Sequence, residues 1–203
     1  MSSSTAPTPS GGESRTIGAV ELPPAARREL LAFARACLEA DLVGAVPPPP
    51  PDDGRLAEPR GAFVSLYAGA ELRGCIGHLA ADRPLAEVVA RMAVAAARRD
   101  PRFPPVTADE LADLRIEISV LSQPLRLEPP DPARIVIGRH GVMVRRGRAL
   151  GVLLPQVGPA HRWDARALLA ATCRKAGLSA DAWREPETQV FVFEAHVIAE
   201  AEA

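Results

Sequence analysis

Apolar residues recur along the chain at two spacings, one typical of helices and the other of strands. From Pro23 to about Leu42 they return every three or four residues, which predicts a helix whose buried stripe includes Cys37. The same spacing predicts helices from Pro84 to about Arg99 and from about Asp164 to Ala176. Asp82 is expected to cap the second of these helices.

Short apolar runs and alternating polarity predict the strands. Residues 62–67 and 71–76 flank an Ala-Gly-Ala connection and are expected to form a hairpin. Residues 115–121 alternate between apolar and polar side chains, and three short strands joined by glycine turns are expected between Ile135 and Leu154. A last strand is predicted from Gln189 to Ile198. Because strands and helices do not alternate regularly, the pattern indicates an α+β fold.

Composition indicates how the chain is divided into domains and in which compartment it is found. Residues 1–16 are poor in large apolar side chains and are expected to form a disordered tail ahead of a single domain at 17–203. The three cysteines are widely spaced and match neither a disulfide framework nor a paired zinc motif. No apolar run approaches the ~20 residues that cross a bilayer, and the N-terminus lacks the pattern of a signal peptide. A cytoplasmic protein is therefore expected.

Charge and aromatic content argue against one class of function. The 24 Lys and Arg residues are balanced by 25 Asp and Glu residues, so the net charge is -1. A general nucleic-acid binder needs a local positive surplus to hold phosphates. Aromatic residues make up only 4% of the chain, too few for a platform on which bases stack.

The segment from Glu71 to His78, Glu-Leu-Arg-Gly-Cys-Ile-Gly-His, is the strongest candidate for a site. If it is a strand, Arg73, Cys75 and Gly77 share one side because side chains alternate with period 2. Gly74 and Gly77 leave the main chain uncovered, which suits the close approach of another molecule. The segment therefore predicts a surface that meets a ligand.

Six ordered segments, this one among them, resemble a known family. They are Gly-Ala-Phe-Val-Ser-Leu (61–66), Leu-Arg-Gly-Cys-Ile-Gly (72–77), Ala-Ala-Ala-Arg-Arg-Asp-Pro-Arg-Phe-Pro-Pro-Val (95–106), Ile-Gly-Arg-His-Gly-Val (137–142), Leu-Leu-Pro-Gln-Val (153–157) and Cys-Arg-Lys-Ala-Gly-Leu (173–178). From about Leu30 to Ile198 the chain resembles the AMMECR-type domain family, whose bacterial members include AmmeMemoRadiSam system protein A. The resemblance implies two lobes: a larger mixed sheet flanked by helices and a smaller antiparallel β lobe, which we place at about 122–160.

Three residues are candidates for catalysis. Cys75 is the candidate nucleophile, and Arg73 together with the freed backbone amides would supply positive potential that favours its thiolate. His140, in a turn framed by glycines, or Glu117, on the polar face of its strand, would act as the base. The structural alternatives stay open: Cys75 as a packing residue, His140 as a turn residue and Glu117 as an ordinary exposed carboxylate.

Seven residues are candidates for ligand binding: Arg73, Gly74, Gly77, Arg98, Asp100, Arg102 and Gln156. The guanidinium groups of the arginines can bind a carboxylate or a phosphate through two hydrogen bonds. Alternatively, Asp100 only neutralises the arginines around it at the end of a helix. Gln156 either reads a ligand or closes a turn. His78 forms a Cys-x-x-His pair with Cys75, but two ligands are too few, so no metal is assigned. No cofactor is assigned either.

Three functions follow as hypotheses. The resemblance implies an accessory or substrate-binding component that acts with a mediator-of-motility-type protein and a radical-SAM protein in a modification pathway. The chain has no Cys-x3-Cys-x2-Cys motif, so it would not itself hold an iron–sulfur cluster. The alternatives are a free-standing enzyme with Cys75 as nucleophile and a nucleotide- or nucleic-acid-binding module.

Overall fold

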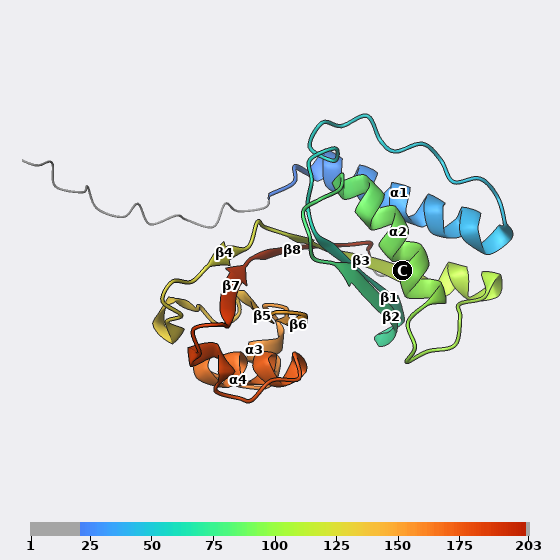
Figure 1. The fold of residues 1–203 in the computed structure, drawn as a ribbon. Coiled ribbons are helices and arrows are strands. Elements are labelled where there is room, and N and C mark those ends of the chain that lie inside the picture. The colour runs from blue at the N-terminus through green and yellow to red at the C-terminus, as the bar shows by residue number, and fades with distance from the viewer. Residues whose placement is uncertain (1–20, 202–203) are drawn as a thin grey trace, which may run out of the picture.

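The computed structural model describes residues 21–201, and its first lobe is a four-stranded sheet with two helices on one face (Figure 1). The strands are β1 (Ala62–Ala68), β2 (Glu71–His78), β3 (Leu114–Leu121) and β8 (Ala195–Ala199), in the order β2-β1-β3-β8. The helices are α1 (Pro24–Val43) and α2 (Leu85–Arg98), which pack on each other. The tail predicted at residues 1–16 lies outside the described residues.

One face of this sheet builds the first core because its side chains alternate. Val64 and Leu66 of β1 and Ile116 of β3 are fully buried in one cluster with apolar side chains of both helices. Their neighbours in sequence, among them Ser65 and Glu117, point to the opposite face, against which no helix of residues 21–201 packs. The sheet therefore has one face packed by the helices and one face that is only partly covered, where Phe63 packs against the cluster of Leu121, Val152 and Phe193.

The second lobe is a four-stranded sheet with its own core. Its strands are β4 (Leu125–Arg126), β5 (Gly141–Arg146), β6 (Ala149–Leu153) and β7 (Gln189–Phe193), in the order β4-β7-β5-β6. The helix α4 (Ala165–Lys175) packs Leu168 and Leu169 against Val142 and Val144 of the sheet. Shorter helical segments are η1 (Ala108–Asp113), η2 (Pro132–Arg134), α3 (Val157–Ala160) and η3 (Ala182–Arg184).

The chain passes between the two sheets twice, and both crossings lie at one pair of residues, Ser122 and Glu194. Ser122 N–H donates to Glu194 C=O at 2.9 Å, and Glu194 N–H donates to Ser122 Oγ at 2.9 Å. On one side of this pair the chain runs in the first sheet, and on the other side it runs in the second. The strand predicted from Gln189 to Ile198 is therefore two strands, β7 and β8, in different sheets.

The α+β class is confirmed, and three details differ from expectation. All strand pairs are antiparallel, so the larger lobe does not hold a mixed sheet. Residues 135–137 form no strand: the chain turns there after η2, with Ile135 N–H bonded to Pro132 C=O and Gly138 at φ 86°. The second sheet instead takes β7, so this lobe and its core extend beyond 160 to Phe193.

The predicted cap of α2 is also wrong. Pro84 occupies the N-cap position without a side-chain hydrogen bond. Asp82 lies outside the helix, where its Oδ1 is 2.6 Å from Nε2 of His78. The cause is local geometry, because the first amides of the helix, those of Leu85 and Ala86, donate to the carbonyl oxygens of Glu58 and Leu56 instead of to a capping side chain.

Candidate functional site

Cys75 lies on the edge strand β2 and faces away from the helices. Its neighbour Gly74 faces α2, and a Cβ atom there would lie 2.2 Å from the carbonyl oxygen of Ala96. Only glycine lets the backbones of α2 and β2 approach this closely. Because side chains alternate along a strand, the thiol of Cys75 points to the helix-free face, where it is partly exposed.

Asp100, just after α2, fixes the main chain at Cys75. Its Oδ2 accepts the N–H of Cys75 at 2.9 Å, and Arg102 donates to the same carboxylate through Nε at 2.9 Å and Nη2 at 2.6 Å. The side chain of Asp100 is 2% exposed. Hydrogen bonds from Arg102, and then from the two backbone amides, hold the pKa of Asp100 well below its ordinary value. The carboxylate of Asp100 therefore has a structural role: it fixes the main chain of the edge strand β2 at Cys75.

Arg73 makes its contacts away from the thiol. Its guanidinium bonds Glu110 at 2.7 and 3.1 Å and the carbonyl oxygen of Pro104 at 2.7 Å. The ion pair lowers the pKa of Glu110 to about 2, and Glu110 also accepts the N–H of Thr107, the N-cap residue of η1. The pairing of β1 with β2 shifts register between Leu66 and Tyr67, opposite Arg73, which interrupts the simple alternation assumed from sequence.

A row of polar side chains crosses the sheet at Cys75. Ser65 is paired with Cys75 on one side and with Glu117 on the other, so the three residues lie side by side on the helix-free face. Ser65 Oγ lies 3.2 Å from Sγ of Cys75. Sequence reasoning found both ends of this row but missed Ser65, whose signal was its position opposite Cys75 in the predicted hairpin.

Tyr67 extends the row on β1. The guanidinium of Arg115 lies 4.8 Å from the centre of its ring, and Arg115 approaches Glu117 at 3.8 Å. Burial raises the pKa of Tyr67, with smaller contributions from Glu117 and Cys75, while Arg115 opposes them. Tyr67, Arg115 and Glu117 line an open cavity of about 980 Å³, whose wall also includes Glu200.

His140 lies in the second lobe, immediately before β5. Its Nδ1 accepts the N–H of Val136 at 3.2 Å, and burial lowers its pKa below the ordinary value. Within residues 21–201, no hydrogen bond or ion pair joins His140 to Cys75 or Glu117. The structure therefore brings Cys75 and Glu117 into one row and places His140 in a turn of the other sheet.

Of the remaining predicted residues, Arg98 and Gly77 have structural contacts and Gln156 is exposed. Arg98 bonds Asp41 of α1 at 2.9 Å and the carbonyl oxygen of Val106 at 3.2 Å. Gly77 is covered by the ring of Phe63, which a Cβ atom would meet at 2.1 Å. Gln156 is exposed at the N-cap of α3 in the second lobe, without a capping hydrogen bond.

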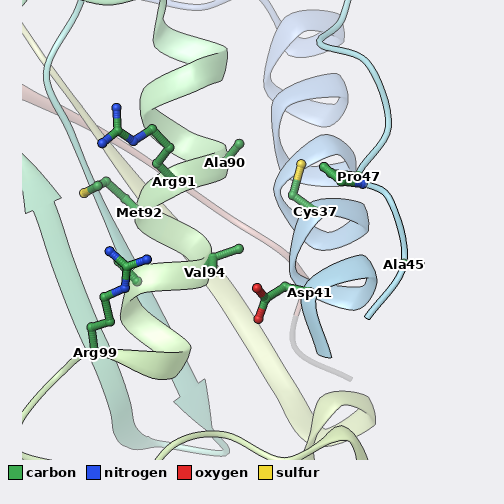
Figure 2. A pocket seen from close by; sticks show the side chains of 10 residues that line it. Cys37, Asp41, Ala45, Pro47, Ala90, Arg91, Met92, Val94 and Arg99 are labelled. Carbon is green, nitrogen blue, oxygen red and sulfur yellow. The ribbon is translucent and has the colours of Figure 1, made fainter. Parts of the chain in front are cut away.

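A second cavity, of about 360 Å³, lies between α1 and α2 and contains none of the predicted site residues (Figure 2). Cys37 and Asp41 of α1 and Val94 of α2 extend into the space between the helices, beneath Pro47. The carboxylate of Asp41 is occupied by Arg98. This cavity is chiefly a gap between packed helices, whereas the cavity at Tyr67 adjoins the polar row.

Two further findings bear on the chemistry of the chain. Among residues 21–201, no three His, Cys, Asp or Glu side chains are grouped so that they could hold a metal ion. Over the same residues, no helix has both the length and the apolar character needed to span a bilayer.

Comparisons with known proteins give one consistent result. The model of the AMMECR1 family matches residues 31–198. Protein MK0488 of Methanopyrus kandleri is 46% identical over 159 residues, covering 75% of this chain and 77% of that protein. A protein of Methanosarcina acetivorans is 41% identical, covering 86% of this chain and 92% of its own. The crystal structure of the uncharacterized protein PH0010 from Pyrococcus horikoshii superposes with a TM-score of 0.78 at 40% identity, covering 84% of this chain and 89% of that one.

Proposed function

Since the chain belongs to the AMMECR1 family, we propose that it is a substrate- or partner-binding component of a modification pathway, acting with a mediator-of-motility-type protein and a radical-SAM protein. The binding surface is the helix-free face of the first sheet. One observation carries this assignment: a partly exposed thiol, fixed through its main chain by Asp100, stands in a polar row beside an open cavity. The proposed setting is the cytoplasm, because the three cysteines are free thiols.

The cavity supplies charges that a polar partner or substrate would meet. Arg115 and Glu117 are about one-fifth exposed and approach each other only at 3.8 Å, beyond hydrogen-bonding distance. Both therefore retain donors and acceptors for a ligand. The arginines at 98 and 102, in contrast, are paired with aspartates and hold the fold together.

An association experiment tests this proposal. The full chain is mixed with the mediator-of-motility-type and radical-SAM proteins of the same genome, and complex formation is followed by size-exclusion chromatography and calorimetry. We expect a complex whose affinity falls at least tenfold in R115A and E117A. The matched control is R145A, because Arg145 is an exposed arginine of the second sheet whose guanidinium bonds Gln189 and lies over the ring of Phe191. No complex at tens of micromolar protein, or equal losses in all three variants, would refute the proposal.

A second candidate, an enzyme with Cys75 as nucleophile, is favoured by the hydroxyl of Ser65 at 3.2 Å from the sulfur. Burial raises the pKa of Cys37 and of Cys173, so both should react slowly. Labelling with iodoacetamide, followed by peptide mass spectrometry, should modify Cys75 at least tenfold faster than the other two. Equal rates at the three cysteines would exclude a catalytic thiol.

The third candidate, a nucleotide- or nucleic-acid-binding module, gains no support from the arginines proposed for phosphate contact. Arg98 and Arg102 each bond an aspartate, and the net charge of the chain is -1. Binding to RNA or DNA that weakens steeply with salt would revive this candidate.

A further inference from the structure

The first sheet has two edge strands, and their outer main-chain groups differ. At β2, the N–H of Cys75 donates to the carboxylate of Asp100 at 2.9 Å, so this edge is blocked by a side chain. At the other edge, β8 pairs only with β3 among residues 21–201. An edge strand that keeps free N–H and C=O groups is a template for pairing with another strand.

Hydrogen bonds at the two ends of β8 show which of its main-chain groups face β3. Glu200 N–H donates to Ile116 C=O at 3.0 Å at one end, and Ser122 N–H donates to Glu194 C=O at 2.9 Å at the other. Both are hydrogen-bonded pairs, and such pairs recur at every second residue of an antiparallel ladder. The register of β8 against β3 has no shift between these ends.

The ladder therefore leaves every second residue of β8 with free main-chain groups. His196 and Ile198 bond to β3, because they stand at even spacing between Glu194 and Glu200. The residues whose N–H and C=O groups point out of the sheet are Ala195, Val197 and Ala199. Within residues 21–201, these outward groups have no hydrogen-bond partner.

The side chains of β8 leave this edge accessible and uncharged. Val197 is 47% exposed, and Ala199 is exposed as well. The strand reads Ala-His-Val-Ile-Ala, so it has none of the lysines or prolines that commonly protect an edge. Burial lowers the pKa of its one titratable side chain, His196, which is therefore neutral at pH 7.

The carboxylates at the two ends of β8 are neutralised within the chain. Glu194 is paired with Arg139 at 2.7 Å, and Glu200 is paired with Arg35 at 2.5 Å. A strand that approached the edge would therefore meet partial charges of main-chain groups and apolar side chains, without an unpaired formal charge.

The outer edge of β8 is complementary to itself. In an antiparallel pairing about a two-fold axis at Val197, this residue lies opposite its counterpart in a second copy, and Ala195 lies opposite Ala199. Every outward N–H then faces an outward C=O, so opposite partial charges meet along the whole edge. The side chains that meet on the helix-free face are alanine and valine, which are small and apolar.

We infer that the β8 edge pairs with the β8 edge of a second copy of this chain and joins the two first sheets into one continuous antiparallel sheet. The two-fold axis runs perpendicular to the sheet, so both helix-free faces lie on the same side of the dimer. The inference goes beyond the proposed function and does not depend on it.

The size of the contact sets the expected affinity. Five residues from each copy bury less than the ~1,200 Å² at which stable complexes begin. We therefore expect a weak dimer with a Kd of about 10 to 100 μM.

Sedimentation of the full chain from about 5 to 500 μM tests the pairing. V197K and V197E each place like charges opposite each other at the two-fold axis, and should weaken the dimer at least tenfold. An equal mixture of V197K and V197E should restore it, because opposite charges then meet. V197P removes only an outward N–H and keeps the bonds to β3, so it should fold and also weaken the dimer at least tenfold.

The matched control is L150K, because Leu150 is an apolar residue of similar exposure, 48%, on the edge strand β6 of the second sheet. It should dimerise like the unmodified chain. A chain that stays monomeric up to 500 μM, a dimer that survives V197K or V197P, or a mixture that fails to restore it would overturn the inference.

Hydrogen exchange distinguishes a second copy from any other occupant of the edge. The amides of Val197 and Ala199 should become protected as the protein concentration rises through the Kd, whereas the amide of Cys75 should not change. Protection of Val197 and Ala199 that is independent of concentration would mean that another segment of the same chain covers the edge, and would also overturn the inference.

Discussion

The two sheets of the molecule are built alike on one face and differently on the other. In each, a glycine lets a helix lie against the sheet: a Cβ atom at Gly74 would lie 2.2 Å from Ala96 O, and one at Gly151 would lie 2.2 Å from Thr172 O. The opposite face of the second sheet carries Met143, Val152 and Phe193 in an apolar cluster that joins the lobes. The first sheet carries the polar row there.

This difference separates cysteines of the same chain into two roles. Cys173 is fully buried between α4 and the second sheet, and burial raises its pKa. Cys75 lies on the face that the first core does not use, and its main chain and thiol have polar partners. The proposed site therefore lies on the face of the first sheet that the helices do not pack against, apart from the apolar cluster at Phe63.

The largest expected effect comes from filling the two glycine contacts. G74A and G151A should each lower the free energy of unfolding by about 3 kcal/mol, because a backbone oxygen must move to admit the methyl group. Denaturant unfolding measures the loss, and hydrogen exchange shows which lobe loses protection. G54A is the control, since nothing lies within 4 Å of a Cβ atom at that position. Equal loss of protection in both lobes would show that they unfold as one unit.

Removing the carboxylate that fixes β2 should have the next largest effect. D100A deprives the amides of Cys75 and Arg102 of their acceptor and should cost about 2 kcal/mol at pH 7. Because the folded pKa of Asp100 is depressed, its contribution is present above the ordinary Asp value and is lost as the pH falls below about 4. Urea titrations at pH 7 and pH 3 should show the gap between variant and parent narrowing in acid. A gap that is equal at both values would contradict this reading.

The clasp at the end of β8 should have a smaller effect. Glu200 receives Arg35 at 2.6 and 2.5 Å and the N–H of Ile116 at 2.8 Å, and the pair is about three-quarters shielded from solvent. E200A should cost about 1 to 2 kcal/mol and increase hydrogen exchange in β8. E128A is the control in the second lobe, where the Arg126–Glu128 pair is exposed and should contribute less than about 0.5 kcal/mol. Equal costs would mean that burial of the Glu200 clasp contributes nothing.

Sequence reasoning was most successful where a local pattern decides the structure. The hairpin of β1 and β2, the helices α1, α2 and α4 and the burial of Cys37 all follow from apolar spacing, and all are present. The same reasoning joined β7 to β8, because the run from Gln189 to Ile198 is continuous in sequence. The bond between Glu194 and Ser122 that divides it joins residues 72 positions apart and leaves no local signal.

The candidate site shows the same limit. Cys75 and Glu117 were proposed from residue type, but their separation by Ser65 depends on the pairing of three strands. The partner of Arg73 lies 37 residues away at Glu110, and a register shift opposite Arg73 redirects the chain. Single-sequence patterns report which residues share a face, whereas contacts between distant segments come from register and from the ends of helices.

The smallest predicted effect is a pH dependence that compares one histidine of each lobe, the buried His140 and the half-buried His196. Burial lowers the pKa of His140 in the second lobe and of His196 in the first below 6.5. Below that pH the unfolded chain gains protons that the folded chain does not, so stability is complete above pH 6.5 and declines as the pH falls from there. H140N keeps an acceptor for Val136 N–H but does not titrate.

Urea titrations between pH 7.5 and pH 5.5 measure this effect. The slope of stability against pH should be reduced in H140N, reduced in H196N and nearly absent in the double variant. H161N is the control, because His161 is exposed and stacks on Trp163 at 4.4 Å. Hydrogen exchange at pH 5.5 should then show protection restored to the second lobe by H140N and to the first by H196N. If neither substitution changed the slope, other groups would be responsible for the pH dependence, and the two histidines could not be used to distinguish the stability of the lobes.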